Sequence, residues 1–468
     1  MTFNSLQFAL FLPLVIGLYW WRPKFQNPLL LAASYFFYGY WDPRFLLLIA
    51  ASTVIDYSVA RGIDASDDDR RRKSLLMISL IANLGILGIF KYFNFFADSL
   101  DEALEGLGAG GFKPSLDIIL PVGISFYTFQ TMSYTIDVYR RRLGAEMSLL
   151  NVAVYVAFFP QLVAGPIERA THFMPQVTSD RSFPVPDKWV EGIGLIALGI
   201  FKKVVLADAV APIVQRAFAD PGSQSSLTLL LALYGFAIQI YADFSGYSDV
   251  ARGTSMLLGF DLLENFRQPY LSRNITMFWR TWHISLSNWL RDYLYITLGG
   301  NRGGTARTYR NLFLTMLLGG LWHGSSWNFV IWGALHGFYL AFERAFRKLD
   351  DRPADVMPGI RDIPNVLLTF HLVCFAWIFF RASTFTEAAD YIRGFTNLGF
   401  DFDIGDVTII LAAISVSLFL DFAQRHAKAH VPMMNWRPIP LGAALGSGIT
   451  AIILFSGGAS VPFLYFQF

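Results

Sequence analysis

The chain is a succession of long apolar runs separated by short polar stretches. The runs recur from Leu6 to Phe466, and the polar stretches between them are only loop-sized: 61–73, 98–114, 167–188 and 347–364. Since a helix needs about twenty apolar residues to cross a bilayer, the pattern predicts an all-α polytopic membrane protein with about eleven spanning helices plus re-entrant segments.

Several of the runs are interrupted by proline and glycine, at 121–123, 159–160, 165–166 and 299–300. Inside a membrane, backbone leaves the helix only where protein or a water-filled cavity surrounds it. These breaks therefore predict a protein-lined interior. We find no internal repeat and no linker between soluble domains, so residues 1–468 are expected to form a single membrane domain.

The first run, residues 6–21, lacks a basic leader and a small-residue cleavage site, which indicates a retained helix rather than a signal peptide. Basic residues follow alternate runs, at Arg22 and Lys24, within 61–73 and at 140–142. Because basic loops stay in the cytoplasm, these clusters predict that the N-terminus and residues 98–114 lie outside.

Composition and charge exclude several other classes. Hydrophobic residues make up 54% of the 468, which is more than a soluble core of this size needs. A net charge of +2 gives no reason to expect a nucleic acid partner. Cys374 is the only cysteine, so neither an internal disulfide nor a thiolate metal cluster is expected.

Polar residues concentrate between Gln239 and Arg310. On a helix, Asp249 and Arg252 are three residues apart and face each other. One interpretation is a buried ion pair that joins two helices, and the alternative is that Asp243 and Asp249 line a hydrated cavity. The next stretch, 278–293, is too polar to face lipid along its length and predicts a buried or re-entrant helix.

His323 lies deep in apolar sequence, where an ionisable side chain is costly and indicates chemistry or transport. A neutral imidazole can take a proton from an attacking hydroxyl, and burial favours that neutral form. For both His323 and His283, a hydrogen-bonded packing role is the alternative. His336 comes thirteen residues after His323, on about the opposite face of a continuous helix. It would share the site only if the chain broke at 324–325, so we expect a structural role.

Two further patterns carry weaker hypotheses. His426 and His430 have the spacing of a zinc pair, but they lack a third ligand and predict a solvated boundary segment rather than a metal site. The glycine-rich stretch 298–304 lacks the features of a phosphate-binding loop and predicts a flexible turn. Arg302 and Arg307 beside it are candidates, on charge alone, to contact the phosphates of a substrate.

The longest motifs are FWRTWHISLSNWLRDYLYITLGG at 278–300, the histidine-containing stretch 311–327 and WGALHG at 332–337. With them the chain resembles the membrane-bound O-acyltransferase family, in the branch that O-acetylates alginate and other exported glycans. The resemblance extends over nearly the whole chain through four further pieces: 121–140, 159–167, 241–253 and 465–468.

The resemblance implies a ring of tilted helices around a tunnel, with His323 at the catalytic position of the family and His283 at its second polar position. It implies transfer of acetyl from a cytoplasmic thioester, acetyl-CoA or a phosphopantetheine carrier, with no permanently bound cofactor. The expected acceptor is an exported polysaccharide, often reached through a periplasmic partner of the SGNH-hydrolase type, and the expected location is the bacterial inner membrane.

Other polar residues are candidates for the tunnel wall or the donor site: Asp243, Asp249, Arg252, Arg280, Ser285, Ser287, Asn288, Trp322, Arg302 and Arg307. Two alternative functions stay open at this point. The same fold can acylate a lipid or a small metabolite. A solute transporter or channel, whose intramembrane charges line a path, belongs to a different class.

Overall fold

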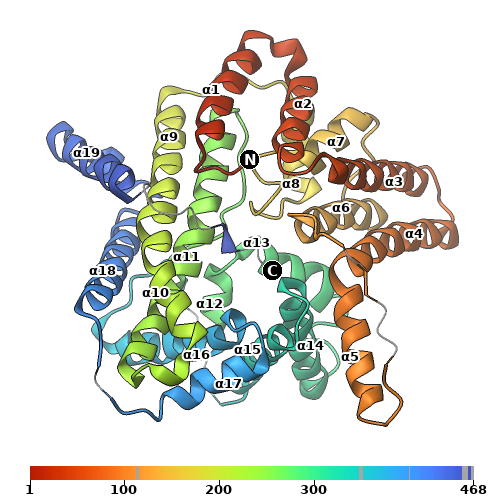
Figure 1. Cartoon of the computed structure of the whole chain (residues 1–468). Coiled ribbons are helices and arrows are strands. Elements are labelled where there is room, and N and C mark those ends of the chain that lie inside the picture. The colour runs from red at the N-terminus through yellow and green to blue at the C-terminus, as the bar shows by residue number, and fades with distance from the viewer. Residues whose placement is uncertain (112–114, 117, 347–351, 400, 456–461, 465–468) are drawn as a thin grey trace. The chain divides into compact units, whose positions relative to one another are not determined.

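The computed structural model describes residues 1–111, 115–116, 118–346, 352–399, 401–455 and 462–464 (Figure 1). Every regular element in these ranges is helical, which confirms the all-α prediction. The four predicted breaks, at 121–123, 159–160, 165–166 and 299–300, all lie outside helices.

The chain forms two compact units. The first comprises residues 1–189 and 254–263, and the second comprises 190–253 and 264–468. A single membrane domain over the whole chain stays a prediction, and each unit is described by itself below.

The first unit is built mainly from eight helices: α1 (Leu6–Trp21), α2 (Gln26–Gly39), α3 (Leu46–Asp64), α4 (Asp69–Leu87), α5 (Phe93–Glu105), α6 (Ile124–Tyr139), α7 (Leu149–Ala157) and α8 (Ala170–Thr178). A π-helical turn, Gly88–Tyr92, joins α4 to α5.

Helices α3, α4 and α6 pack together (Figure 1), and a cluster of buried polar side chains lies between them. The carboxylate of Asp56 accepts hydrogen bonds from Ser79 Oγ at 2.5 Å and from Asn83 Nδ2 at 2.9 Å. Thr135 Oγ1 of α6 lies 3.0 Å from Ser79 Oγ, and Thr131 Oγ1 donates to Asn83 Oδ1. Since a charge within a membrane protein needs partners, this cluster explains why polar side chains of all three helices meet at one place.

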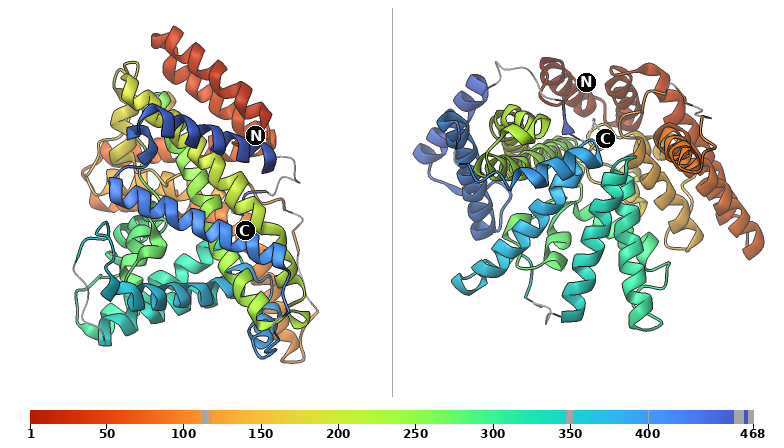
Figure 2. Two further views of the ribbon diagram at one scale, coloured as in Figure 1. Left: turned by 90° about the vertical axis from the view of Figure 1, so that its left-hand side faces the viewer. Right: turned by 60° about the horizontal axis from the view of Figure 1, so that its bottom comes forward.

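The second unit contains the remaining helices: most of α9 (Pro186–Phe201) and of α11 (Ser226–Leu257), and all of α10 (Asp208–Ala219), α12 (Ile275–Thr281), α13 (Ile284–Trp289), α14 (Thr305–His323), α15 (Trp327–Phe346), α16 (Ile363–Arg381), α17 (Phe385–Gly394), α18 (Ile404–Ala427) and α19 (Pro438–Phe455). Helices α14 and α15 lie side by side as a hairpin (Figure 2).

Glycines let α9 approach α11 at backbone distance. A Cβ added to Gly199 would lie 2.4 Å from the carbonyl oxygen of Gly246, which no side chain tolerates. Small residues at such crossings are typical of helices packed within membranes. Immediately after this contact, α9 passes into a π-helical turn, Lys202–Ala207, whose two lysines are buried.

By length and composition, five helical stretches of the described residues can cross a membrane: Pro43–Asp64, Asp69–Glu105, Ser226–Leu257, Ile360–Arg381 and Ile404–Ala427. Leu6–Trp21 and Ile439–Phe455 are apolar but shorter. The expected number was about eleven. The difference arises because other helices are short, as α7, α12 and α13 are, or carry polar residues, as α6 does. The helix count and the ring around a tunnel stay predictions.

Candidate active site

His323 is the last residue of α14 and is buried, with 4% of its surface exposed. Aromatic rings surround it, with centroid distances of 5.0 Å to Trp322, 5.0 Å to Trp332 and 5.3 Å to Phe380. The helix ends there because Gly324 is extended, with φ −159°. The chain then turns into α15 at Trp327.

His283 is fully buried at the break between α12 and α13. Its backbone is left-handed, with φ 42°. Residues other than glycine adopt this conformation at a cost, and it persists only where the surroundings enforce it. The single helix expected over 278–293 is therefore two short helices and a π-helical turn, Leu290–Tyr295. The expected burial is confirmed for most of the stretch, but Arg280 and Arg291 are exposed.

Asn265 holds the backbone that follows His283. Its carbonyl oxygen accepts a hydrogen bond from Ile284 N at 2.9 Å. Its Oδ1 accepts two more from Ser285, from N at 3.2 Å and from Oγ at 2.7 Å. Asn265 is itself buried, so these contacts are shielded from water and fix the start of α13.

The structure brings His283 and His323 together, since their ring centroids are 6.3 Å apart. That separation leaves room for one reacting atom within hydrogen-bond reach of both rings. Phe244 and Trp322 pack on His283 at 4.6 Å and 5.8 Å. The result is an aromatic enclosure with two imidazoles, suited to moving a proton where little water competes.

His336 lies closer to this pair than a continuous helix would allow. The chain does break between α14 and α15, and both His323 and His336 pack against the ring of Trp332, at 5.0 Å and 4.7 Å. Trp279 Nε1 donates a hydrogen bond to His336 Nδ1. The condition under which His336 could share the site, a break at 324–325, is therefore met, while the hydrogen bond from Trp279 agrees with the structural role expected for His336.

The predicted charges on α11 are paired, but not with each other. Asp249 forms an ion pair with Lys202 at 2.8 Å, whereas Arg252 contacts the imidazole of His430. Asp243 pairs with Lys203 at 2.7 Å and also accepts a hydrogen bond from Leu464 N. A buried ion pair that joins two helices is thus present, but Asp249 forms it with Lys202 rather than with Arg252, because the π-helical turn after α9 brings lysines to this face of α11.

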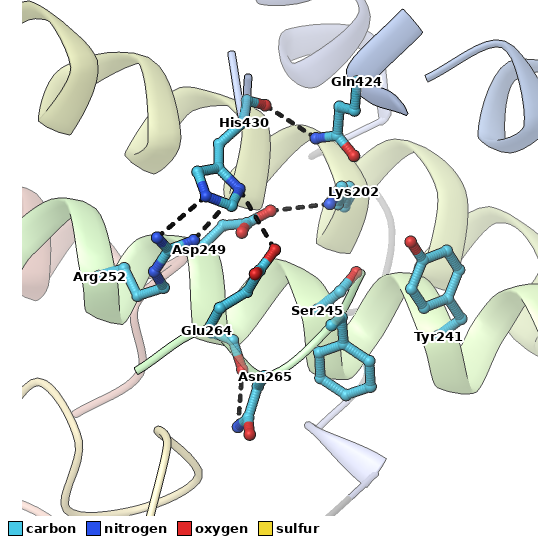
Figure 3. A pocket seen from close by; sticks show the side chains of 11 residues that line it. Lys202, Tyr241, Ser245, Asp249, Arg252, Glu264, Asn265, Gln424 and His430 are labelled. Atoms are coloured by element: carbon cyan, nitrogen blue, oxygen red, sulfur yellow. Dashed lines mark hydrogen bonds and ion pairs between the residues drawn. The ribbon is translucent and has the colours of Figure 1, made fainter. Parts of the chain in front are cut away.

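Asp249 and Arg252 line a small polar pocket, which we call the inner pocket (Figure 3). Its volume is about 10 Å³. Around it are Lys202, Tyr241, Ser245, Ser248, Glu264, Asn265, Phe266, Gln424 and His430. Burial lowers the pKa of His430, and the neighbouring Arg252 guanidinium lowers it further. His430 is thus part of a polar wall, whereas His426 is exposed as expected.

The remaining candidates lie around the histidines or apart from them. Ser287 Oγ donates a hydrogen bond to Trp282 O, and Asn288 is half-buried on α13. Arg302 and Arg307 are exposed beside a turn of positive-φ glycines and line neither pocket described in this unit. Residues 465–468 lie outside the described part of the chain.

Sequence reasoning missed Asn265, His430 and the role of the buried lysines. Lys202 and Lys203 are visible as charges inside an apolar segment, which is the signal that a partner exists elsewhere. Asn265 carries no such signal, because a single asparagine in a polar stretch is ordinary.

Comparison with known proteins gives a family. The model described as MBOAT, membrane-bound O-acyltransferase family, matches residues 44–385. A probable alginate O-acetylase of Azotobacter vinelandii is 44% identical over 90% of this chain and 85% of its own length. The same enzyme of Pseudomonas putida is 40% identical over the full length of both. The peptidoglycan O-acetyltransferase of Helicobacter pylori is 36% identical over 81% of this chain and 75% of its own length.

The matched region contains both paired histidines as well as three of the five long apolar stretches in full. The apolar helices and the family together indicate a multi-pass membrane protein. The relatives are named as O-acetyl-transferring enzymes. The protein is thus an O-acyltransferase, and the chain belongs to the membrane-bound O-acyltransferase family.

Proposed function

We propose that the protein passes acetyl groups from a cytoplasmic thioester across the inner membrane for O-acetylation of an exported polysaccharide. The observation that carries this proposal is the buried pair His283 and His323, 6.3 Å apart in an aromatic enclosure, in a chain of this family. The polysaccharide acceptor is supported by the relatives, which are named for alginate and peptidoglycan.

In the proposed reaction, His323 is the general base. The acceptor hydroxyl oxygen attacks the carbonyl carbon of the thioester while His323 takes its proton. The C–S bond then breaks, and the leaving thiolate recovers that proton from the imidazolium. Because a thiolate leaves readily, one base and the alignment of two substrates suffice, and no protein nucleophile or resident cofactor is needed. His283 lies on the opposite side of the same space and orients the reacting group.

The donor is acetyl-CoA or a phosphopantetheine carrier. We propose that the acceptor on the outer side is reached through a periplasmic partner of the SGNH-hydrolase type, which delivers the acetyl to the glycan. The alternative function, a transporter, is less well supported, since Asp243 and Asp249 form ion pairs with Lys203 and Lys202. Paired charges of this kind hold helices together and do not form an open path.

The test is mass spectrometry of envelope glycans from a strain that lacks the gene. Ester-linked acetyl groups are expected to disappear from one glycan and to return with the wild-type chain. If every glycan keeps its acetyl groups while a lipid or a small metabolite loses an acyl group, the acceptor is that molecule instead.

A further inference from the structure

A second pocket of about 230 Å³ adjoins the inner pocket in the same unit. We call it the outer pocket. The two share Glu264, Gln424 and His430 in their walls. The outer pocket is also lined by Arg267, Gln268, Asp355, Arg425, Lys428 and Ala429. It is therefore a polar cavity with three permanent cations, at the point where α18 ends.

Arg425 is the most unusual of these cations. It is buried, with 5% of its surface exposed, and within the described residues no carboxylate lies within ion-pair distance of its guanidinium; the buried Asp421 and the exposed Asp355 act on it from farther away. Nη2 donates to the carbonyl oxygens of Arg267 and Gln268, and Nη1 makes no hydrogen bond to any described residue. A buried guanidinium with unused donors is costly unless an anion meets it.

The other charges of the outer pocket leave that role open to a ligand. Lys428 is exposed and, in the part of the chain that the structure describes, forms no ion pair. Glu264 pairs with Arg267 and lies 3.6 Å from His430, so it is already occupied. Asp355 is exposed, where solvent screens it. The local balance favours an anion held by Arg425 and Lys428.

The inner pocket connects this cation site with the histidines. Ser245 is 1% exposed in its wall, and its Oγ makes no hydrogen bond within the described structure. Its wall also includes Asn265, which holds the turn after His283, and Phe266, whose ring lies 6.5 Å from that of His283. The wall of the inner pocket, between the cations and His283, thus includes a hydroxyl group with unused hydrogen-bonding capacity.

We propose that the outer pocket binds the phosphate of a phosphopantetheine-type thioester, with Arg425 and Lys428 as its contacts. The amide-rich pantetheine arm then runs past Ser245 towards His283. The inference rests on the proposed function, because it names the donor of that reaction. Since the inner pocket holds about one water, the arm enters when the contacts of His430 with Arg252 and Glu264 separate.

The direction of α11 agrees with this role. Leu257, its last residue, accepts a hydrogen bond from Trp20 Nε1 at 3.0 Å. Trp20 adjoins Arg22 and Lys24, a basic cluster that the sequence predicts to be cytoplasmic. Arg252 lies within the last turns of the same helix, whose end is thereby predicted, by the positive-inside rule, to be cytoplasmic.

Calorimetry of the purified full chain in detergent tests the site with three probes: coenzyme A, 4′-phosphopantetheine and pantetheine. We expect wild type to bind the two phosphorylated probes at least about tenfold more tightly than pantetheine, as hydrogen bonds to charged groups provide. Lys428→Glu should weaken both phosphorylated probes by about tenfold or more and leave pantetheine unchanged. Coenzyme A that binds more tightly than 4′-phosphopantetheine indicates the free coenzyme as donor, and equal binding indicates a carrier.

Two further variants separate binding from folding. Arg425→Gln should repeat the phosphate-specific loss, and Arg361→Glu, an equal charge change at an exposed residue outside both pockets, should bind all probes as wild type does. Equal binding of pantetheine and 4′-phosphopantetheine by wild type overturns the proposal. So does an equal loss of all three probes in Lys428→Glu.

The proposed function can fail separately. If the deletion strain loses glycan acetyl groups while the calorimetry shows no phosphate preference, the reaction stands and this donor site is wrong. If the phosphate preference depends on Arg425 and Lys428 but no glycan loses acetyl, the site stands and the polysaccharide acceptor is wrong.

Discussion

At the scale of single residues, the proposed reaction depends most on His323. Replacing it with alanine removes the proposed base but leaves a small side chain at a helix end, so insertion in the membrane should persist. We expect glycan acetylation to fall by roughly 10²–10⁴-fold, the usual contribution of a general base. Ester-linked acetyl groups are measured in a strain that carries only the variant, alongside an immunoblot of the membrane fraction.

His371→Ala is the matched control, because this histidine is exposed on α16 and contacts Tyr234 rather than the site. It should acetylate as wild type does. Wild-type acetylation by His323→Ala would show that another group is the base.

Asn265 is expected to act as a positioning residue, through His283. Asn265→Ala removes both hydrogen bonds that its Oδ1 accepts from Ser285 and frees the strained turn at His283. Because small displacements of an aligned group cost up to about 10²-fold, we expect turnover to fall by roughly ten- to hundredfold with little change in donor KM. Asn265→Asp keeps the acceptor oxygen and should recover most of the turnover. If KM alone rises, the residue acts in binding rather than in positioning.

The histidine pair could be predicted from the sequence, and its polar surroundings could not. The motifs around His283 and His323 identify both residues, although forty positions separate them. The partners of Asp243 and Asp249 lie in another helix, and a π-helical turn decides which lysine reaches which carboxylate. Helical spacing within α11 favoured Arg252 instead, because local periodicity contains no information about distant partners.

At the scale of elements, the hairpin of α14 and α15 holds His323 against Trp332. A Cβ at Gly324 would lie 2.0 Å from the ring of Phe329, so Gly324→Ala must displace that ring, which packs on Phe380 beside His323. We expect the variant to lose about 1–3 kcal/mol of stability, as other overpacked sites do. We also expect it to lose most of its acetylation activity. Thermal unfolding in detergent and glycan analysis measure the two effects.

The matched control is Gly17→Ala on α1, where an added Cβ meets nothing within 4 Å. Alanine there should be neutral or stabilising, because glycine disfavours helices. Unchanged stability and activity in Gly324→Ala would show that the hairpin is not tightly packed at His323.

The segment that begins α8 should make the stability of the first unit depend on pH. His172 Nδ1 lies 2.8 Å from Glu168 Oε2, and this hydrogen bond raises the pKa of His172 above its ordinary 6.5. Burial raises the pKa of Glu168 above its ordinary 4.5. Both groups hold protons more tightly in the folded state, so the stability that they contribute is present at low pH. It is lost as the pH rises through their folded values.

The unfolding midpoint is therefore expected to fall as the pH rises above 6.5, the ordinary pKa of histidine. His172→Gln should remove the part of this fall that begins above pH 6.5. The Asp261 carboxylate lies 3.9 Å from the His172 ring and also raises the pKa of that histidine. Circular dichroism melts in detergent at several pH values measure the profile. A midpoint that rises over this range would contradict the prediction.

Element boundaries were predictable where proline, glycine or basic loops mark them, and less so elsewhere. The four predicted breaks lie outside helices. For residues 278–293, by contrast, the sequence predicts one polar helix, whereas the structure has two short helices followed by a π-helical turn. The break at His283 has no glycine or proline signal, because hydrogen bonds that Ile284 and Ser285 donate to Asn265, distant in sequence, enforce it.

At the scale of the whole molecule, hydropathy predicted the class of protein better than the number of spans. Apolar runs identify helices that face lipid. In α18, for example, only 22% of the residues in its apolar stretch are buried. Helices inside the protein, such as α6, carry polar side chains that form hydrogen bonds with other buried side chains. Hydropathy alone therefore predicts less burial than these helices have. A count of spans from sequence therefore depends on helices whose partners only the folded chain reveals.

Orientation in the membrane is predicted by the basic loops and can be measured directly. Cys374 is 1% exposed, so the wild-type chain should resist a membrane-impermeant maleimide and provide a silent background. Asp67 and Ala109 are exposed, in the basic loop before α4 and in the segment after α5. By the positive-inside rule, Ala109→Cys should label from outside in intact spheroplasts and Asp67→Cys only in inverted vesicles. The reverse pattern would place the basic clusters outside and would contradict the predicted orientation.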